Sequence, residues 1–173
     1  MPAGLGSTQA QRDRGMSVPV DRKVMFLASP LAYVERPTQV ETIETHYSWV
    51  FLTDRYVYKL KKPLRGTGFD FSTIEARLCN AETEVRLNRR LTPDVYLGVV
   101  PLILKAGGNL SIGGKGAITD WLVEIVRLPA ERMLDRCLAR GDWHYAHIHV
   151  LAARLGHFAG SLTGSSRRCS RIP

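Results

Sequence analysis

The chain has 173 residues, the length of one ordinary domain or of one lobe of a larger one, and 45% of them are hydrophobic. This composition excludes fibrous and wholly disordered proteins, and no apolar stretch approaches the roughly 20 residues of a membrane-spanning helix. We therefore expect no membrane partner. The net charge of +8 points to nucleic acid or phosphate as a partner, but half of the excess lies near the two ends of the chain.

Both ends of the chain lack the periodic patterns of folded elements. Residues 1–23 contain no apolar signal segment, so we predict a disordered leader, with Met1 and Met16 both candidates for the natural start. Residues 161–173 are predicted to be a disordered tail. The cysteines are odd in number and form no C-x-x-C pair, which favours a reducing, cytoplasmic location. They are Cys79, Cys137 and Cys169.

The first part of the body predicts a short helix followed by a β-meander. Residues 24–34 have a helical pattern that is interrupted near Pro30. The pattern then alternates with a period of two and is rich in β-branched and aromatic residues, which is typical of strands. The three predicted strands span residues 40–45, 49–53 and 56–62. Tight turns between them make an antiparallel meander the most economical arrangement.

The capping sequence Ser72-Thr73-Ile74-Glu75 predicts the start of a helix that ends near Leu91. At about 100° per residue, Glu84 falls inside the apolar arc of this helix, so its carboxylate should point toward protein. Further strands are predicted at 96–104 and 120–128, with a hairpin turn at 107–109, and helices at 131–139 and 146–159. The fold class is therefore α+β.

Lys59 and Glu84 form the sharpest candidate site. Alternation along the third strand places Val57, Lys59 and Lys61 on one face. A lysine whose rotamer is fixed by a carboxylate suits a phosphate clamp, and a small apolar side chain two residues earlier suits an adenine ring. The alternative is a solvated basic strand edge with Glu84 at its rim.

The turn at 46–48 could cover phosphates with backbone N–H groups and the Ser48 hydroxyl, or be a plain hairpin turn. The glycines between 107 and 116 do not fit a P-loop. The histidines of 144–157 do not share one helix face, and the serines and Cys169 of the tail lack a neighbouring base. We therefore predict no metal site and no catalytic nucleophile in this chain.

Five segments together resemble a bacterial family. The chain is similar to the aminoglycoside phosphotransferase-like proteins of the protein-kinase-like superfamily, particularly the group often fused to a P-loop ATPase-like domain. The resemblance covers about residues 25–158. The segments are THYSWVFL at 45–52, YKLKKP at 58–63, FDFST at 69–73, EVRLNRRL at 84–91 and DVYLGVVP at 94–101.

The resemblance implies a kinase-like N-lobe over residues 24–128, with a five-stranded antiparallel sheet and one long helix, and an incomplete C-lobe over 129–160. Lys59 matches the lysine that contacts ATP phosphates and Glu84 the glutamate that pairs with it, with Lys61 as the competing lysine. Val57 would touch adenine. The segment 124–128 resembles the hinge strand, where backbone groups of Ile125 and Arg127 would bind the adenine edge.

The chain departs from the family where catalysis would take place. A kinase-like enzyme needs a catalytic aspartate and further Asp or Asn groups to hold magnesium. No H-G-D loop is present, and no acidic residue follows Asp142. We therefore expect ATP as the ligand, with weak or absent binding by this chain, and no phosphoryl transfer by this chain alone. Mg²⁺ is expected only in a complete family member, and a missing or separately encoded C-lobe is the expected partner. A non-catalytic interaction or regulatory module, or a nucleic-acid-binding domain using the basic run 55–65, are the alternatives.

Overall fold

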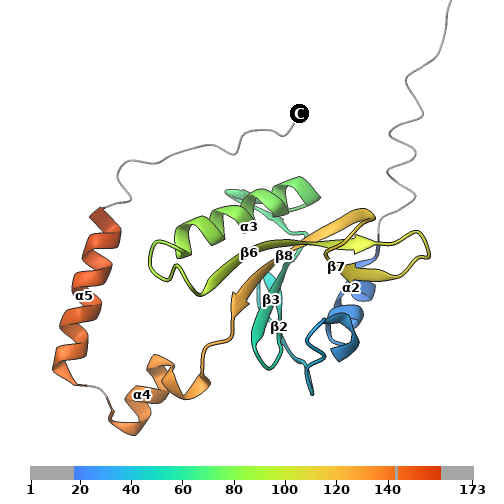
Figure 1. The fold of residues 1–173 in the computed structure, drawn as a ribbon. Helices are drawn as coiled ribbons and strands as arrows, with labels where there is room; N and C mark the ends of the chain where they lie inside the picture. The colour runs from blue at the N-terminus through green and yellow to red at the C-terminus, as the bar shows by residue number, and fades with distance from the viewer. Residues whose placement is uncertain (1–17, 143, 161–173) are drawn as a thin grey trace, which may run out of the picture.

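The computed structural model describes residues 18–142 and 144–160. Within them the protein is α+β, as predicted, and an antiparallel sheet is covered by helices on both faces (Figure 1). Its six strands are β1 (Glu41–Glu44), β2 (Ser48–Leu52), β3 (Tyr56–Lys61), β6 (Tyr96–Leu104), β7 (Leu110–Ile112) and β8 (Ala117–Val126). They lie in the order β1-β2-β3-β8-β6-β7, one strand more than the sequence indicated because β7 was not foreseen.

The predicted meander of β1, β2 and β3 is confirmed, with strand ends that differ by at most one residue. β8 lies between β3 and β6, so strands that are distant in sequence form the middle of the sheet. Lys59 of β3 lies opposite Val50 of β2 and Val123 of β8. Because side chains alternate along a strand, these three residues share one face of the sheet.

β6 is irregular at its start. Tyr96 pairs with Ile125, but the next paired residues are Gly98 and Glu124, so Leu97 is an extra residue that forms a β-bulge. Tyr96 accordingly packs with Ile125 and with α3 on the same face of the sheet.

Helix α3 (Ile74–Asn88) covers this face. Thr73 caps the helix by accepting a hydrogen bond from the Ala76 N–H at 3.1 Å, which agrees with the predicted start. Ala81 and Val85 are buried against Val123. The predicted end at Leu91 was wrong by three residues, because the helix ends at Asn88 and a turn follows.

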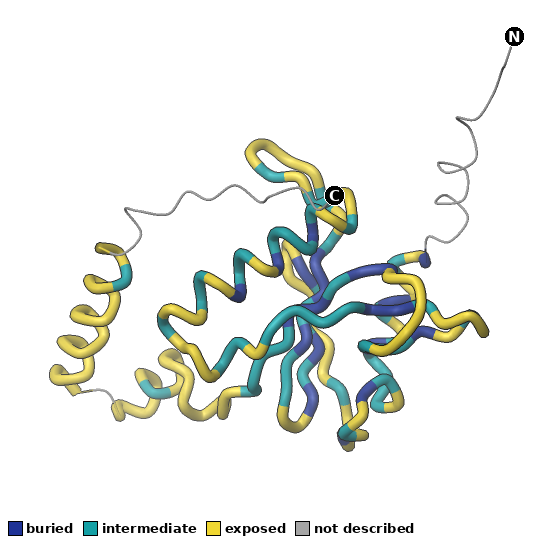
Figure 2. The backbone as a smooth tube through the Cα atoms, turned by 45° about the horizontal axis from the view of Figure 1, so that its top comes forward, coloured by how far each residue is buried: buried dark blue, intermediate teal, exposed yellow. Residues whose placement is uncertain are grey.

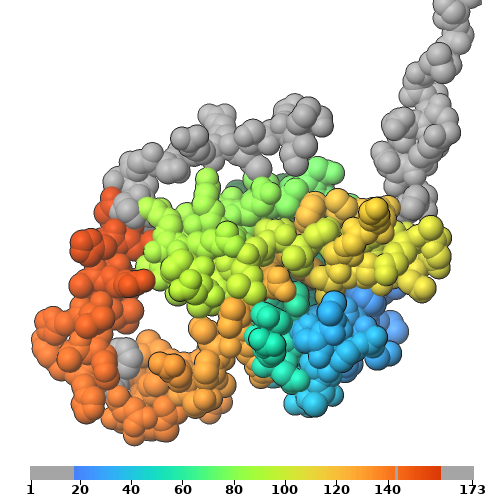
Figure 3. All heavy atoms as spheres, viewed as in Figure 1, coloured from blue at the N-terminus to red at the C-terminus, as the bar shows by residue number. Residues whose placement is uncertain are grey.

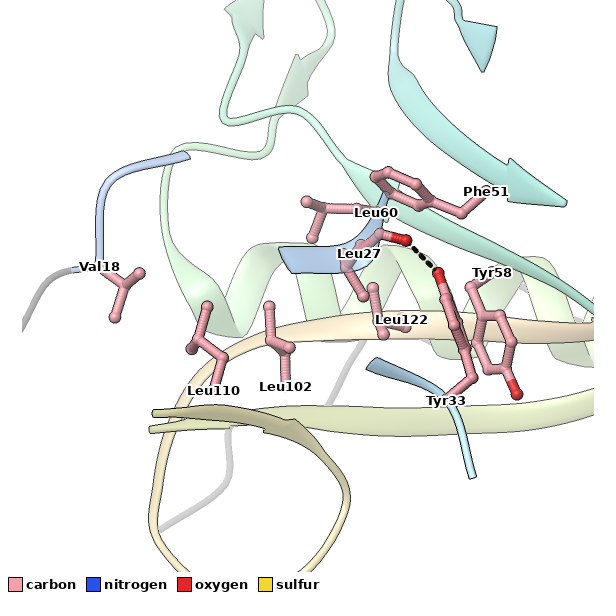
Figure 4. Packing of buried hydrophobic residues seen from close by; sticks show 9 residues of the cluster. All are labelled: Val18, Leu27, Tyr33, Phe51, Tyr58, Leu60, Leu102, Leu110 and Leu122. Atoms are coloured by element: carbon pink, nitrogen blue, oxygen red, sulfur yellow. Dashed lines mark hydrogen bonds between the residues drawn. The ribbon is translucent and has the colours of Figure 1, made fainter. Parts of the chain in front are cut away.

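The opposite face carries the larger core, which is closed by helix α2 (Val20–Leu27) and the short 3-10 helix Pro30–Ala32. Figure 4 shows Tyr33 against Tyr58, with the Tyr33 hydroxyl donating a hydrogen bond to the Leu27 carbonyl at 2.5 Å. The fully buried side chains of this core are Leu27, Phe51, Leu60, Leu102 and Leu122.

The boundary of the predicted disordered leader was wrong. Val18 is buried, α2 begins at Val20, and Lys23 is only 6% exposed, so residues 18–23 belong to the folded part. Residues 1–17 and 161–173, the rest of the predicted leader and the predicted tail, lie outside the described residues. A two-strand pair of β4 (Arg65–Gly66) and β5 (Phe69–Asp70), which was not predicted, precedes α3.

The C-terminal part consists of the short 3-10 helix Ala130–Arg132, α4 (Leu134–Arg140) and α5 (Tyr145–Gly160), so the two predicted helices are present. Among its described residues none is buried (Figure 2). Figure 3 shows these helices beside the sheet domain, with an opening on the side of α4. α5 contacts the turn after α3, where the Arg154 guanidinium donates to the Leu91 carbonyl at 2.8 Å. Of the helices in the described part of the chain, none has the length and apolar character needed to cross a bilayer.

Candidate functional site

The candidate site forms where β3 passes beneath α3. Lys59 and Lys61 alternate onto the face covered by α3, and Glu84 extends from the helix toward them. The Lys59 Nζ donates a hydrogen bond to Glu84 Oε1 at 2.5 Å, and the Lys61 Nζ donates to Glu84 Oε2. The predicted inward direction of Glu84 is thus confirmed, and its carboxylate bridges both candidate lysines instead of selecting one. We call these three residues the Glu84 cluster.

The electrostatics of the Glu84 cluster favour an ionised carboxylate. Burial alone would raise the pKa of Glu84, but the hydrogen bonds and charges of Lys59 and Lys61 outweigh it and hold the pKa below its ordinary value. The cluster carries two positive charges and one negative charge. Its excess positive charge is the electrostatic condition for binding an anion.

The two lysines differ in their access to solvent. The Lys59 side chain is 25% exposed, whereas Lys61 is 10% and Glu84 14% exposed. Among the described residues, each ammonium group has Glu84 as its hydrogen-bond acceptor and no other. An ammonium group can donate three hydrogen bonds. Lys59 therefore has both spare donors and an open side from which a ligand could approach.

Apolar side chains extend from Lys59 along the same face. Val57 lies opposite Ile125 of β8, which in turn lies opposite Tyr96 of β6. The pKa of Tyr96 is raised above its ordinary value, mainly by burial and secondly by the negative charge of Glu84. The Tyr96 hydroxyl is therefore close enough to the Glu84 cluster to interact with its charges. Val57 and Ile125 thus form an apolar row on the same face as Lys59, two residues along β3 from it.

Ser48 is the first residue of β2 and lies opposite Lys61 of β3. The residue is only 3% exposed. Its N–H donates to Thr45 Oγ1 at 3.0 Å, and the Thr45 N–H donates to the Ser48 carbonyl at 2.8 Å. This is a plain hairpin turn. The Ser48 N–H is thus already bonded within the turn, and the contact of the Ser48 hydroxyl with a phosphate stays a prediction.

The predicted hinge residues lie at the end of β8. Ile125 is flanked by strands on both sides. The Arg127 N–H donates to the Arg55 carbonyl at 2.9 Å, and its guanidinium donates to the Thr53 carbonyl at 2.7 Å. The Arg127 N–H therefore continues the sheet and is not directed at a ligand.

The basic run 55–65 does not form one positive surface. Lys59 and Lys61 face α3 and share Glu84, whereas Lys62 lies over the Trp49 ring and pairs with Glu44. Arg65 pairs with Asp70 at 3.2 Å. Since these cations are divided between faces and have acidic neighbours, the geometry does not favour a phosphate-backbone stripe.

A second charged group, missed from the sequence, lies at Asp120. Lys23 donates to Asp120 Oδ2 at 2.8 Å, and Arg77 donates to both carboxylate oxygens at 2.8 and 3.0 Å. All three residues are buried. We call them the Asp120 cluster. Two sequence features could have indicated that Arg77 and Asp120 are buried: Arg77 falls on the same helical stripe as Ala81, and Asp120 stands at the start of an apolar strand.

Two further expectations concern metals and nucleophiles. Within residues 18–142 and 144–160, no three His, Cys, Asp or Glu side chains are grouped as metal ligands would be. The tail serines and Cys169 lie outside the described residues.

Comparisons with protein-family models, with curated proteins and with solved structures found no match to this chain. The geometry of the Glu84 cluster is accordingly the basis for a functional assignment.

Proposed function

We propose that the chain is the nucleotide-binding N-terminal portion of a kinase-like small-molecule phosphotransferase, similar to the aminoglycoside phosphotransferase-like proteins. One observation carries this proposal: Lys59, on the third strand of a meander, is paired with Glu84 on the inward face of the next long helix. In protein kinases, a strand-three lysine and a helix glutamate form the ion pair that must be in place for ATP to be used.

The arrangement around the pair supports the same proposal. A meander, a covering helix and two long strands follow one another as in a kinase-like N-lobe, to which α2 and β7 are additions. Val57 and Ile125 supply the apolar row that an adenine ring needs, next to the ammonium group that its phosphates need. Arg127 follows this row at the end of β8, where the chain leaves the sheet toward the C-terminal helices.

Phosphoryl transfer requires groups that the described chain does not bring to this site. A catalytic aspartate and metal-binding Asp or Asn residues must lie beside the transferred phosphate. After β8 the acidic residues are Glu131, Asp135 and Asp142, all on the α4 segment, and Asp142 pairs with Arg140 at 2.6 Å. The proposed function is thus ATP binding, with Mg²⁺-dependent transfer only when a separate C-lobe completes the site.

Calorimetric titration of ATP into the full chain tests the proposal. We expect saturable binding that Lys59→Met weakens by roughly tenfold or more, since a charge-assisted hydrogen bond contributes about 1.5–3 kcal/mol. Lys62→Met is the matched control, because Lys62 lies one residue further from the site and faces away from α3. If wild-type protein binds no ATP, or if both variants bind equally, the proposal is wrong.

A non-catalytic interaction module is the second candidate, and the exposed apolar side chains of the C-terminal helices favour it. Met133, Leu138 and Val150 are more than half exposed. A cavity of about 570 Å³ lies between α4, α5 and the turn after α3. Apolar surface of this kind marks a contact with another protein. A chain that binds no ATP but forms a defined dimer or complex in analytical ultracentrifugation would support this candidate instead.

A further inference from the structure

The Glu84 cluster contains one more cation than a simple lysine–glutamate clamp needs. Each oxygen of the Glu84 carboxylate accepts a hydrogen bond from a different lysine, Oε1 from Lys59 and Oε2 from Lys61. The two lysines differ by two positions on one strand and therefore reach the same carboxylate from the same side. The second lysine needs its own explanation.

The two lysines differ in burial, which indicates different roles for them. Lys61 is the more enclosed, lying opposite the buried Ser48, and has Glu84 as its hydrogen-bond acceptor among the described residues. Lys59 is more exposed and continues into the apolar row of Val57 and Ile125. A ligand can therefore reach Lys59 more readily than Lys61.

We propose that Lys61 is a positioning residue, which holds Glu84 in place and balances its charge, so that Lys59 keeps its bond to Glu84 and directs its remaining N–H donors to a phosphate group of a nucleoside di- or triphosphate. This inference rests on the proposed function. Lys61 itself does not touch the ligand in this arrangement.

The physical reason is the charge balance of a carboxylate that is largely shielded from water. Without Lys61, the ammonium group of Lys59 alone would neutralise Glu84, and little of its charge would remain for a phosphate. The cluster would also be neutral and would not attract an anion. With Lys61 present, Glu84 keeps a partner throughout and the net charge before binding is positive.

The charged and titratable groups that face Glu84 are few. Lys59 and Lys61 approach from β3, and Tyr96 approaches from β6. On α3 itself, the Asn88 amide donates to the Glu84 backbone carbonyl at 2.8 Å and leaves the carboxylate to the lysines. Since burial raises the pKa of Glu84 and the lysines lower it, removal of Lys61 should raise that pKa.

The test measures binding of ATP and of inorganic tripolyphosphate by calorimetry between pH 4 and pH 8, a range that extends below the ordinary pKa of 4.5 for Glu84. The proteins are the wild type, Lys61→Met, Lys61→Met with Glu84→Gln, and the control Lys62→Met. We expect Lys61→Met to bind roughly tenfold more weakly at neutral pH, because ionised Glu84 then cancels the charge of Lys59 and the cluster is neutral. The difference should shrink toward acid pH as Glu84 takes up a proton, and Glu84→Gln should restore binding in the Lys61→Met background.

Two results would overturn the inference. Wild-type affinity in Lys61→Met would show that Lys61 has no part in binding. A loss that is the same at every pH and persists in the double variant would show that Lys61 is a direct ligand. Rescue by Glu84→Gln distinguishes positioning from both.

A separate measurement separates this inference from the proposed function. If the wild type binds neither ATP nor tripolyphosphate, the proposed function fails. The interaction of Lys61 with Glu84 is then tested by measuring the pKa of Glu84 from the NMR shift of its carboxyl carbon. A higher pKa in Lys61→Met than in Lys62→Met supports this interaction. An unchanged pKa refutes it.

Discussion

The Asp120 cluster and the Glu84 cluster have the same composition, one carboxylate between two cations, yet they occupy different environments. At Asp120 all three residues are 6% exposed or less, and the cations also donate to backbone carbonyls, Lys23 to Thr119 and Arg77 to Phe71 and Ser72. At Glu84 the Lys59 side chain is 25% exposed, and both lysines have the carboxylate as their acceptor among the described residues.

This difference separates a structural ion cluster from a candidate binding site. The Asp120 cluster joins α2 and α3 to β8, and its donors are largely saturated, so a ligand would have to break existing bonds. The Glu84 cluster has unused donors and an open side. Charge composition alone is thus a poor guide to function, whereas hydrogen-bond saturation and access to solvent are informative.

The largest expected effect is a loss of protein stability when the Asp120 cluster is broken. Asp120→Asn leaves Lys23 and Arg77 without their buried counter-charge, and we expect a loss of about 3–5 kcal/mol in the free energy of unfolding. Urea denaturation measures it, with the exposed Asp94→Asn as a control that should change by less than about 0.5 kcal/mol. Equal effects in the two variants would contradict the structural role.

Glu84→Gln should destabilise the protein less than Asp120→Asn. The side chain of Lys59 reaches solvent, so water can take over part of the lost interaction, and we expect a loss of about 1–3 kcal/mol. The same denaturation measurement compares the two variants. A larger loss than in Asp120→Asn would reverse the distinction between the clusters.

The pH dependence of stability should identify the Glu84 contribution. The pKa of Glu84 is lowered in the folded protein, so its stabilising contribution is present above its ordinary pKa of 4.5 and is lost as the pH falls through the lowered folded value. The free energies of unfolding of wild type and Glu84→Gln should therefore converge below pH 4.5. A difference that stays constant through acid pH would show that the contribution does not depend on the charge of Glu84.

The smallest effect is expected for Lys62→Met. The Lys62 side chain is 14% exposed, but its partner Glu44 is 63% exposed, so water screens the ion pair and it should contribute only about 0–1 kcal/mol. Thermal unfolding should show a small shift, and ATP binding should stay unchanged. A marked loss of binding would mean that the basic run acts as a whole and that the Glu84 cluster is not distinct.

Local patterns predicted a large part of this fold. Alternation and β-branched residues located the meander, the capping sequence located the start of α3, and helical periodicity placed Glu84 toward the sheet. Each of these depends on neighbours within a few residues, which a sequence displays directly. Lys59 and Glu84 were therefore accessible to prediction.

Features that depend on distant contacts were not accessible. β7 has only three residues, too few for a clear alternation, and forms because β6 lies beside it. The Asp120 cluster needs residues separated by more than 40 positions. The bonded N–H groups of Ser48 and Arg127 follow from turn and strand geometry that residue types do not specify.

The bulge at Leu97 fixes the phase of β6 relative to the binding face. Val99 faces α3, and strict alternation would turn Tyr96, three residues earlier, to the opposite face. The extra residue reverses that phase and brings the tyrosine ring to the same side as Ile125. A β6 strand with the same residues but no bulge would turn the phenol away from the lysines, whereas deletion of Leu97 would leave Tyr96 two residues before Val99 and on the same face. The side of the sheet on which Tyr96 lies is therefore determined by the bulge and not by the type of its own residue.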